Sequence, residues 1–211
     1  MKAKKAYFFT LEGIEGVGKS TNLNYIESYL RQKGIDLVVT REPGGTAIAE
    51  SIRQIFLLST NEKMLDETEL LLLFAARNQH IKQVIEPALA KGQWVLCDRF
   101  IDASFAYQGY GRGIPLEKIT YLENWIQKSC NPDLTILLDA SVDVAIRRTK
   151  RRRGAPDRIE VERKAFFHKV RLGYLQRAKE NPSRYRVINA AQSRKKVIQE
   201  ITRVIEDFFH E

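Results

Sequence analysis

The sequence has few cysteines, few histidines and no long apolar run. Its 211 residues include two cysteines, Cys97 and Cys130, too few for a disulfide framework, so we expect a reducing, cytoplasmic location. No segment approaches the roughly 20 apolar residues that span a bilayer, so no membrane partner is expected. The three histidines have no metal-ligand spacing. These shortages argue against disulfide-rich folds, membrane spans and histidine-based metal sites.

Basic residues outnumber acidic residues in the sequence. Lysine and arginine number 35 against 26 acidic residues, a formal net charge of +9, which indicates an anionic partner. Most of the excess lies between Arg147 and Arg158, where seven cationic side chains face Asp157 alone. The cluster is compact and has no interleaved aromatics, so we expect phosphorylated metabolites rather than nucleic acid as partners.

Apolar runs alternate with helical patterns along the whole chain, which predicts a doubly wound parallel sheet flanked by helices. We expect a single domain over residues 1–211, because no linker or repeat interrupts the pattern. The five expected strands are 6–11, 36–40, 93–97, 134–138 and 185–188. The expected helices are 20–33, 46–58, 67–90 with a bend near Pro87, 115–129, 142–152, 159–181 and 194–209.

Four residues come just after predicted strands: Gly13, Arg41, Asp98 and Asp139. Ligands of such sheets bind at the carboxyl ends of the strands. These residues are therefore expected along one edge, although Asp139 is more simply explained as structural.

The stretch from Gly13 to Ser20 matches G-x-x-x-x-G-K-[ST] between a predicted strand and a predicted helix, as a P-loop requires. Its glycines let backbone amides point at phosphate oxygens, and the next helix adds its positive end. Lys19 is expected to bridge the β- and γ-phosphates and Ser20 to hold Mg²⁺. The predicted nucleotide-binding residues of the loop are Gly13, Ile14, Glu15, Gly16, Val17, Gly18, Lys19, Ser20 and Thr21.

The loop does not name a reaction, because GTPases, motor ATPases and small kinases share it. An Asn-Lys-x-Asp guanine reader is absent from the sequence. Six further segments carry a resemblance: 11–20, 40–46, 73–77, 97–100, 106–113 and 152–160. Together they resemble the bacterial thymidylate kinases of the P-loop nucleoside monophosphate kinase family. The resemblance implies a P-loop NTPase fold, ATP and dTMP as substrates, Mg²⁺ as cofactor and a homodimer.

For the acceptor phosphate, the resemblance implies a site around Asp98 and Arg99. The aspartate would lie beside Mg²⁺ and the reacting phosphates, while the arginine would fork onto the acceptor phosphate. Arg53 is implied as a second phosphate-binding arginine. Glu42 is expected to organise these cations, and Arg41 is a further candidate there.

For the nucleoside, the resemblance implies Arg77 as the donor to a thymine carbonyl. Leu73 and Phe74 lie four and three residues earlier, so either can cover the base, and Phe74 is preferred. Ser104, Tyr107 and Gln108 are expected to line the sugar and base. Glu15 matches an acidic position that contacts either the 3′-hydroxyl or nearby water and Mg²⁺.

The basic stretch, about residues 147–158, matches the family's mobile lid. Cations there would stabilise the charge on a transferred phosphoryl group. Arg151 and Arg153 are the implied catalytic arginines, with Arg152 as the alternative in either role, and Arg158 is implied to contact ATP. The rival interpretations are another nucleoside monophosphate or nucleoside kinase, and a P-loop ATPase whose basic cluster binds nucleic acid.

Overall fold

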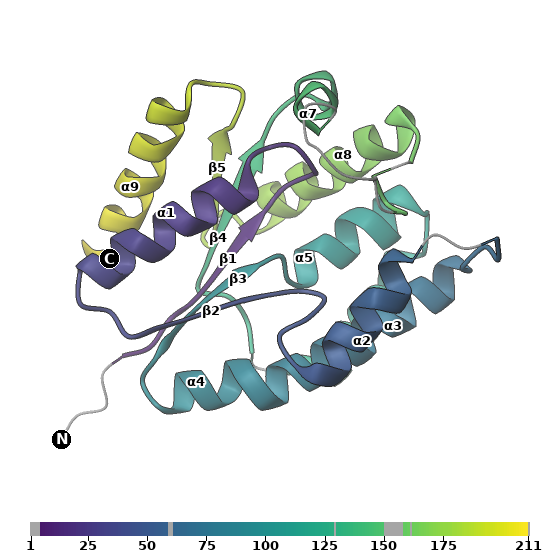
Figure 1. Ribbon diagram of the computed structural model, residues 1–211, viewed down its shortest axis with the longest axis horizontal. Helices are drawn as coiled ribbons and strands as arrows, with labels where there is room; N and C mark the ends of the chain where they lie inside the picture. The colour runs from purple at the N-terminus through teal and green to yellow at the C-terminus, as the bar shows by residue number, and fades with distance from the viewer. Residues whose placement is uncertain (1–4, 59–60, 129, 150–157, 161, 211) are drawn as a thin grey trace.

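A computed structural model describes residues 5–58, 61–128, 130–149, 158–160 and 162–210. At its centre, five parallel strands form a sheet in the order β2-β3-β1-β4-β5 (Figure 1). This confirms the predicted fold class. The strands are β1 (Phe8–Glu12), β2 (Leu37–Arg41), β3 (Trp94–Asp98), β4 (Leu134–Asp139) and β5 (Tyr185–Asn189).

Helices cover both faces of the sheet, with α1 and α9 on one side and α2, α3 and α4 on the other (Figure 1). The described helices are α1 (Lys19–Gln32), α2 (Ala47–Leu57), α3 (Asp66–His80), η1 (Ile81–Ile85), α4 (Glu86–Ala90), α5 (Ile101–Ser104), η2 (Phe105–Gly111), α6 (Leu116–Ile126), α7 (Val142–Thr149), α8 (Lys164–Glu180) and α9 (Arg194–His210), where η marks π-helix.

The central strand β1 is buried along its full length, as expected for a strand covered on both faces. Successive side chains of a strand point to opposite faces. Phe9 and Leu11 accordingly pack in one apolar cluster with Leu96 of β3, while Phe8 packs in the other with Cys97. The two cores clamp β1 between helix layers, which holds the loop after it in place.

The expected bend in the helix 67–90 is present as the π-helical turn η1. Pro87 has no N–H for an α-helical bond, and its ring would crowd the carbonyl four residues earlier. The wider turn avoids this conflict, because the Glu86 N–H bonds to the Ile81 carbonyl five residues back. The second π-helix, η2, was not predicted.

Two expected helices begin or end more than two residues from their predicted bounds, and the end of a third is not described. The prediction 115–129 becomes α6, and 159–181 becomes α8, which begins at Lys164. The prediction 142–152 is α7 as far as Thr149, and residues 150–157 lie outside the described part of the chain.

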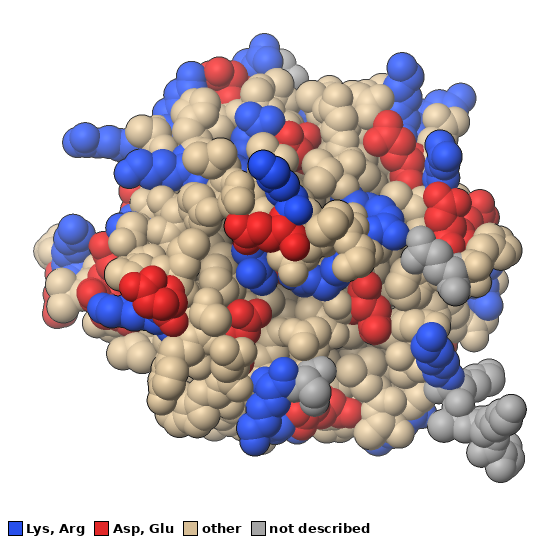
Figure 2. Space-filling view, turned by 180° about the vertical axis from the view of Figure 1, so that it is seen from behind, with Lys and Arg blue, Asp and Glu red and all other residues tan. Residues whose placement is uncertain are grey.

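Acidic and basic side chains are interspersed on the face shown in Figure 2. None of the helices in the described ranges has both the length and the apolar character needed to cross a bilayer.

Candidate active site

The loop between β1 and α1 has the backbone that only glycine supports at its key positions. Gly13 and Gly16 have φ angles of 134° and 80°, outside the usual range of other residues. A Cβ atom on Gly13 would lie 2.4 Å from the Leu138 carbonyl oxygen, and one on Gly16 would lie 2.2 Å from that of Ala145. The loop therefore lies directly against β4 and α7, which positions its amides at the end of the sheet.

Lys19 is buried beneath this loop. Its ammonium donates to the carbonyl oxygens of Gly13 at 2.9 Å and Ile14 at 3.1 Å. Burial and the neighbouring Arg99 lower the pKa of Lys19 to about 8. Phosphate oxygens placed beside this ammonium would balance its positive charge. The position therefore suits an anion-binding lysine.

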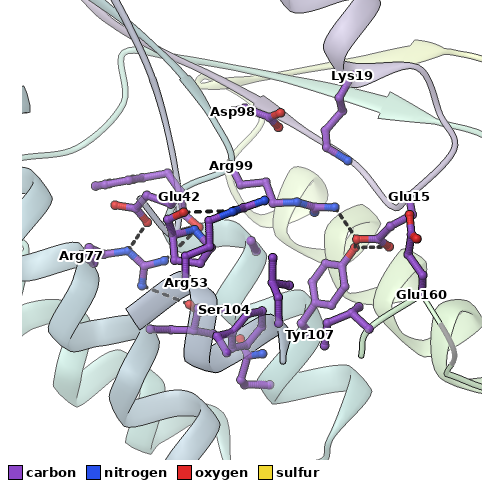
Figure 3. Close-up of a pocket in the computed structure, with 18 of the residues that line it drawn as sticks. Glu15, Lys19, Glu42, Arg53, Arg77, Asp98, Arg99, Ser104, Tyr107 and Glu160 are labelled. Carbon is purple, nitrogen blue, oxygen red and sulfur yellow. Dashed lines mark hydrogen bonds and ion pairs between the residues drawn. The ribbon is translucent and has the colours of Figure 1, made fainter. Parts of the chain in front are cut away.

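Arg99 lies across the cavity from Lys19, one residue past β3 (Figure 3). Its Nη1 donates to the Gly13 carbonyl and to the Tyr174 hydroxyl, each at 2.9 Å, and its Nη2 donates to Glu15 at 2.6 Å. The φ angle of Arg99 is 70°, the left-handed region that non-glycine residues rarely adopt. Such backbone strain is common where a side chain must be aimed at a ligand.

Glu15 connects the phosphate loop to Tyr107 of η2. Its two carboxylate oxygens accept from the Tyr107 hydroxyl at 2.9 and 2.7 Å, in addition to the bond from Arg99. Burial would raise the pKa of Glu15, but Arg99 and Lys19 outweigh it and hold the pKa below its usual value. The carboxylate is therefore ionised and able to fix both Arg99 and Tyr107.

Arg77 occupies the far end of the cavity, where Figure 3 shows it between Glu42 and Ser104. Its Nε donates to Glu42 at 2.7 Å, its Nη1 to Ser104 at 3.0 Å and its Nη2 to the Phe100 carbonyl at 3.2 Å. The guanidinium is thus held in one orientation. Glu42 organises Arg77 and the buried His80 (3.1 Å), whereas Arg53 donates to the Pro43 carbonyl and Arg41 pairs with Glu50.

These groups share one cavity of about 240 Å³. Of the residues predicted from the sequence, it is lined by Glu15, Gly16, Lys19, Ser20, Glu42, Arg53, Leu73, Arg77, Asp98, Arg99, Ser104, Tyr107 and Gln108. Leu73 lies in the lining, while Phe74 lies in the second apolar core, where its ring contacts the Arg77 guanidinium at 4.8 Å. This placement favours Leu73 over Phe74 as the residue beside the base.

The structure does not bring every predicted residue to the cavity. Arg158, expected at ATP, instead forms an ion pair with Glu69 and donates to the Phe56 carbonyl. Arg151, Arg152 and Arg153 lie outside the described residues. The other loop residues predicted to bind nucleotide do not line the main cavity: Gly13, Ile14, Val17, Gly18 and Thr21. Asp139 is held by Arg171 in a bidentate ion pair, as a structural residue would be.

Sequence reasoning missed Glu12 and Tyr174. The fully buried Glu12 accepts from the Phe100 amide at 2.7 Å and from the Tyr174 hydroxyl at 2.8 Å. It thereby supports the backbone just after Arg99 and a hydroxyl that contacts the Arg99 guanidinium. An acidic residue next to an apolar run was the available signal for Glu12, and no signal marked Tyr174 within its helix.

The donors at this edge fit Mg²⁺. The Ser20 hydroxyl and the Asp98 carboxylate are hard oxygen donors, and Asp98 Oδ1 is buried with no hydrogen-bond partner among the described residues. No group of three or more His, Cys, Asp or Glu side chains suited to a metal occurs in the described ranges. Magnesium at a nucleotide site needs no such cage, because phosphates and water complete its coordination.

The P-loop with its buried Lys19 and the guanidinium of Arg99 line the same cavity. Together they define a P-loop phosphotransferase of the α/β class. The family model described as thymidylate kinase matches residues 11–201. The thymidylate kinase of Alcanivorax borkumensis is 52% identical over 200 residues, covering 95% of this chain and 96% of that protein. That of Methylococcus capsulatus is 57% identical over 183 residues, covering 87% and 86%.

A crystal structure of thymidylate kinase from Ehrlichia chaffeensis is similar to this chain with a TM-score of 0.77 at 33% identity. The alignment covers 95% of this chain and 98% of that one. The chain belongs to the thymidylate kinase family, which confirms the resemblance noted in the sequence.

Proposed function

We propose that the cavity is where this chain carries out the reaction of its family, the transfer of the γ-phosphoryl group of ATP to dTMP to give dTDP for dTTP synthesis. The observation that carries the proposal is the contact between the two anion sites. Arg99 donates to the carbonyl oxygen of Gly13 in the phosphate loop at 2.9 Å, so an acceptor phosphate on Arg99 would lie next to the loop.

The chain supplies position and charge rather than a nucleophile. Loop amides and Lys19 would hold the ATP phosphates, while Arg99 and Arg53 would hold the phosphate of dTMP. An acceptor phosphate oxygen can then attack the γ-phosphorus in line, with ADP as the leaving group. No general base is needed, because a phosphate monoester is already mostly dianionic at neutral pH.

At the nucleoside end, we assign the thymine carbonyl to Arg77, the base face to Leu73 and the base edge to Gln108. Tyr107, held by Glu15, would pack against the deoxyribose. Ser20 and Asp98 would hold Mg²⁺, which when bound would neutralise charge on the reacting phosphates. The basic segment of about residues 147–158 is proposed as the lid of a single domain, with Arg151 and Arg153, which lie outside the described residues, supplying cations to the transferred group.

A coupled assay of ATP and Mg²⁺ with a panel of nucleoside monophosphates tests the proposal. We expect dTMP to have the highest kcat/KM. We expect dUMP to follow by a factor of about 10 to 200, because one methyl group is worth about 1–3 kcal/mol in an apolar site. Activity confined to CMP or AMP would contradict the assignment, as would ATP hydrolysis that depends on added DNA or RNA.

We propose the cytoplasm as its location, which the buried, unpaired thiols of Cys97 and Cys130 support. We also propose that the protein is a homodimer formed through α2, α3 and α6. Two apolar side chains are exposed on α2, Ile48 and Ile55, and α3 adds Leu71. On α6, Tyr121 and Trp125 are 70% and 64% exposed and lie one turn apart. Exposed apolar side chains gathered on three packed helices are typical of an interface.

Replacing Trp125 with glutamate should convert the dimer to a monomer, because the new charge would be buried within the proposed interface. Sedimentation velocity across a protein concentration series measures the change. Leu172→Glu is the matched control: Leu172 is 58% exposed but lies on α8, so this variant should stay dimeric. A Trp125→Glu protein that sediments like the parent would place the interface elsewhere.

A further inference from the structure

Glu69 is a buried acid that none of the motifs includes. It lies on α3 with a relative exposure of 0%. Its Oε1 accepts from Gln108 Nε2 at 2.7 Å and from Arg112 Nε at 3.3 Å. Its Oε2 accepts from Arg112 Nη2 at 3.2 Å and forms a 2.7 Å ion pair with Arg158. A carboxylate taken out of water needs such partners, and Glu69 has a complete set.

The two arginines around Glu69 are themselves held in place. The Arg112 guanidinium stacks on Phe166 at 4.6 Å and pairs with Glu162, while that of Arg158 stacks on Phe56 at 4.9 Å. Burial would lower the pKa of Arg112, but Glu69 and Glu162 raise it above its usual value. The two guanidinium groups therefore hold the Glu69 carboxylate in one position, with Gln108 as its one neutral hydrogen-bond partner among the described residues.

This arrangement determines which way the Gln108 amide points. A carboxylate accepts hydrogen bonds and does not donate them, so the NH₂ group of the amide must turn toward Glu69. The other amide atom, Oε1, is buried and has no hydrogen-bond partner in the described part of the chain. The hydrogen-bonding capacity that the amide has left is therefore that of an acceptor. Gln108 lines the main cavity together with Arg77 and Ser104.

An acceptor at this position discriminates between pyrimidines. Thymine and uracil carry an N–H at ring position 3, whereas cytosine has an unprotonated nitrogen there. Opposite thymine or uracil, the acceptor receives a hydrogen bond from N3–H. Opposite cytosine, the acceptor and the unprotonated N3 are both buried without a donor, which costs binding energy. We propose that Glu69 is a specificity-determining positioning residue, which fixes the Gln108 amide so that the site accepts imide pyrimidines and rejects cytosine. This inference rests on the proposed nucleotide site.

Replacing Glu69 with glutamine tests the proposal, since the change removes the charge and keeps the shape. The two guanidinium groups would hold the oxygen of the new amide, and its NH₂ would face Gln108. Gln108 would then reverse and turn its own NH₂ toward the base. The ligand pair to compare is dTMP and 5-methyl-dCMP, which share the methyl group, sugar and phosphate and differ at ring positions 3 and 4.

Isothermal titration with each nucleotide measures the ratio of the two dissociation constants without requiring catalysis. We expect Glu69→Gln to narrow this ratio by about tenfold or more, the worth of one well-placed buried hydrogen bond. At saturating dTMP, kcat should change little. The double variant Glu69→Gln with Gln108→Glu should restore the preference for dTMP, because a carboxylate at position 108 can accept from both sides. Loss of a merely structural contact would not be rescued in this way.

Glu123→Gln is the matched control, since Glu123 also pairs with an arginine, Arg177, but lies outside the cavity lining. It should leave the ratio unchanged. A folded Glu69→Gln protein with the parental ratio would overturn the inference. If that variant does not fold, Gln108→Met tests the same acceptor while leaving Glu69 and its arginines intact, and a parental ratio there would also overturn it. Parent protein that binds dTMP without phosphorylating it would instead contradict the proposed function.

Discussion

Replacing Arg99 with lysine should lower kcat/KM for dTMP by about 100- to 1000-fold, the loss expected when one charged donor to a reacting phosphate is removed. The guanidinium donates in fixed directions to Gly13, Glu15 and the Tyr174 hydroxyl, which aims the whole side chain into the cavity. Lysine keeps the charge but cannot form this fork. Lysine at position 99 would have the same left-handed backbone as arginine. The substitution therefore tests the guanidinium group without changing the backbone strain.

Steady-state kinetics with dTMP as the varied substrate measures the effect, with both a higher KM and a lower kcat expected. Arg171→Lys is a suitable control, because Arg171 is also held by a carboxylate, Asp139, but lies outside the cavity lining. Its kinetic constants should stay close to those of the parent. An Arg99→Lys enzyme with parental kinetics would remove Arg99 from the acceptor site.

Replacing Lys19 with methionine should lower kcat by about 100- to 1000-fold, because methionine fills similar space and supplies no charge to the phosphates. The Gly13 and Ile14 carbonyls hold Lys19 under the loop, and Lys19 lines the cavity where the ATP phosphates would bind. Single-turnover measurements separate the chemical step from ATP binding. A variant whose chemical step was unaffected would show that the lysine only stabilises the loop.

The lowered pKa of Lys19 predicts that the affinity for ATP depends on pH. Burial and Arg99 lower the pKa of Lys19 to about 8 in the free protein. Bound phosphates favour the ammonium and raise this pKa, so affinity is fully present below pH 8 and is lost as the pH rises above it. The loss for one linked proton is at most about tenfold per pH unit. Titration calorimetry between pH 7 and 9.5 should show this fall in the parent but not in Lys19→Met.

The nucleotide loop and the edge of the sheet that bears it could be predicted because both depend on local sequence. A strand, a glycine loop and a helix follow one another within residues 8–32, and the structure has them there as β1 and α1. Asp98 and Arg99 were placed correctly at a strand end for the same reason. The preference for Phe74 over Leu73 had no basis in local sequence, since both lie on the side of a helix that carries Arg77. Only the packing of α3 against the second core settles their positions.

By itself, the sequence determined that the protein has five parallel strands, where its phosphate loop lies and which family it belongs to, because apolar periodicity and short motifs are properties of neighbouring residues. The tertiary structure decided which charges meet. Glu69, Gln108 and Arg158 come together from α3, η2 and the segment before α8, and Glu12 reaches the backbone after Arg99. Such pairings depend on how distant elements pack, and a buried charge is stable only where that packing brings its partner.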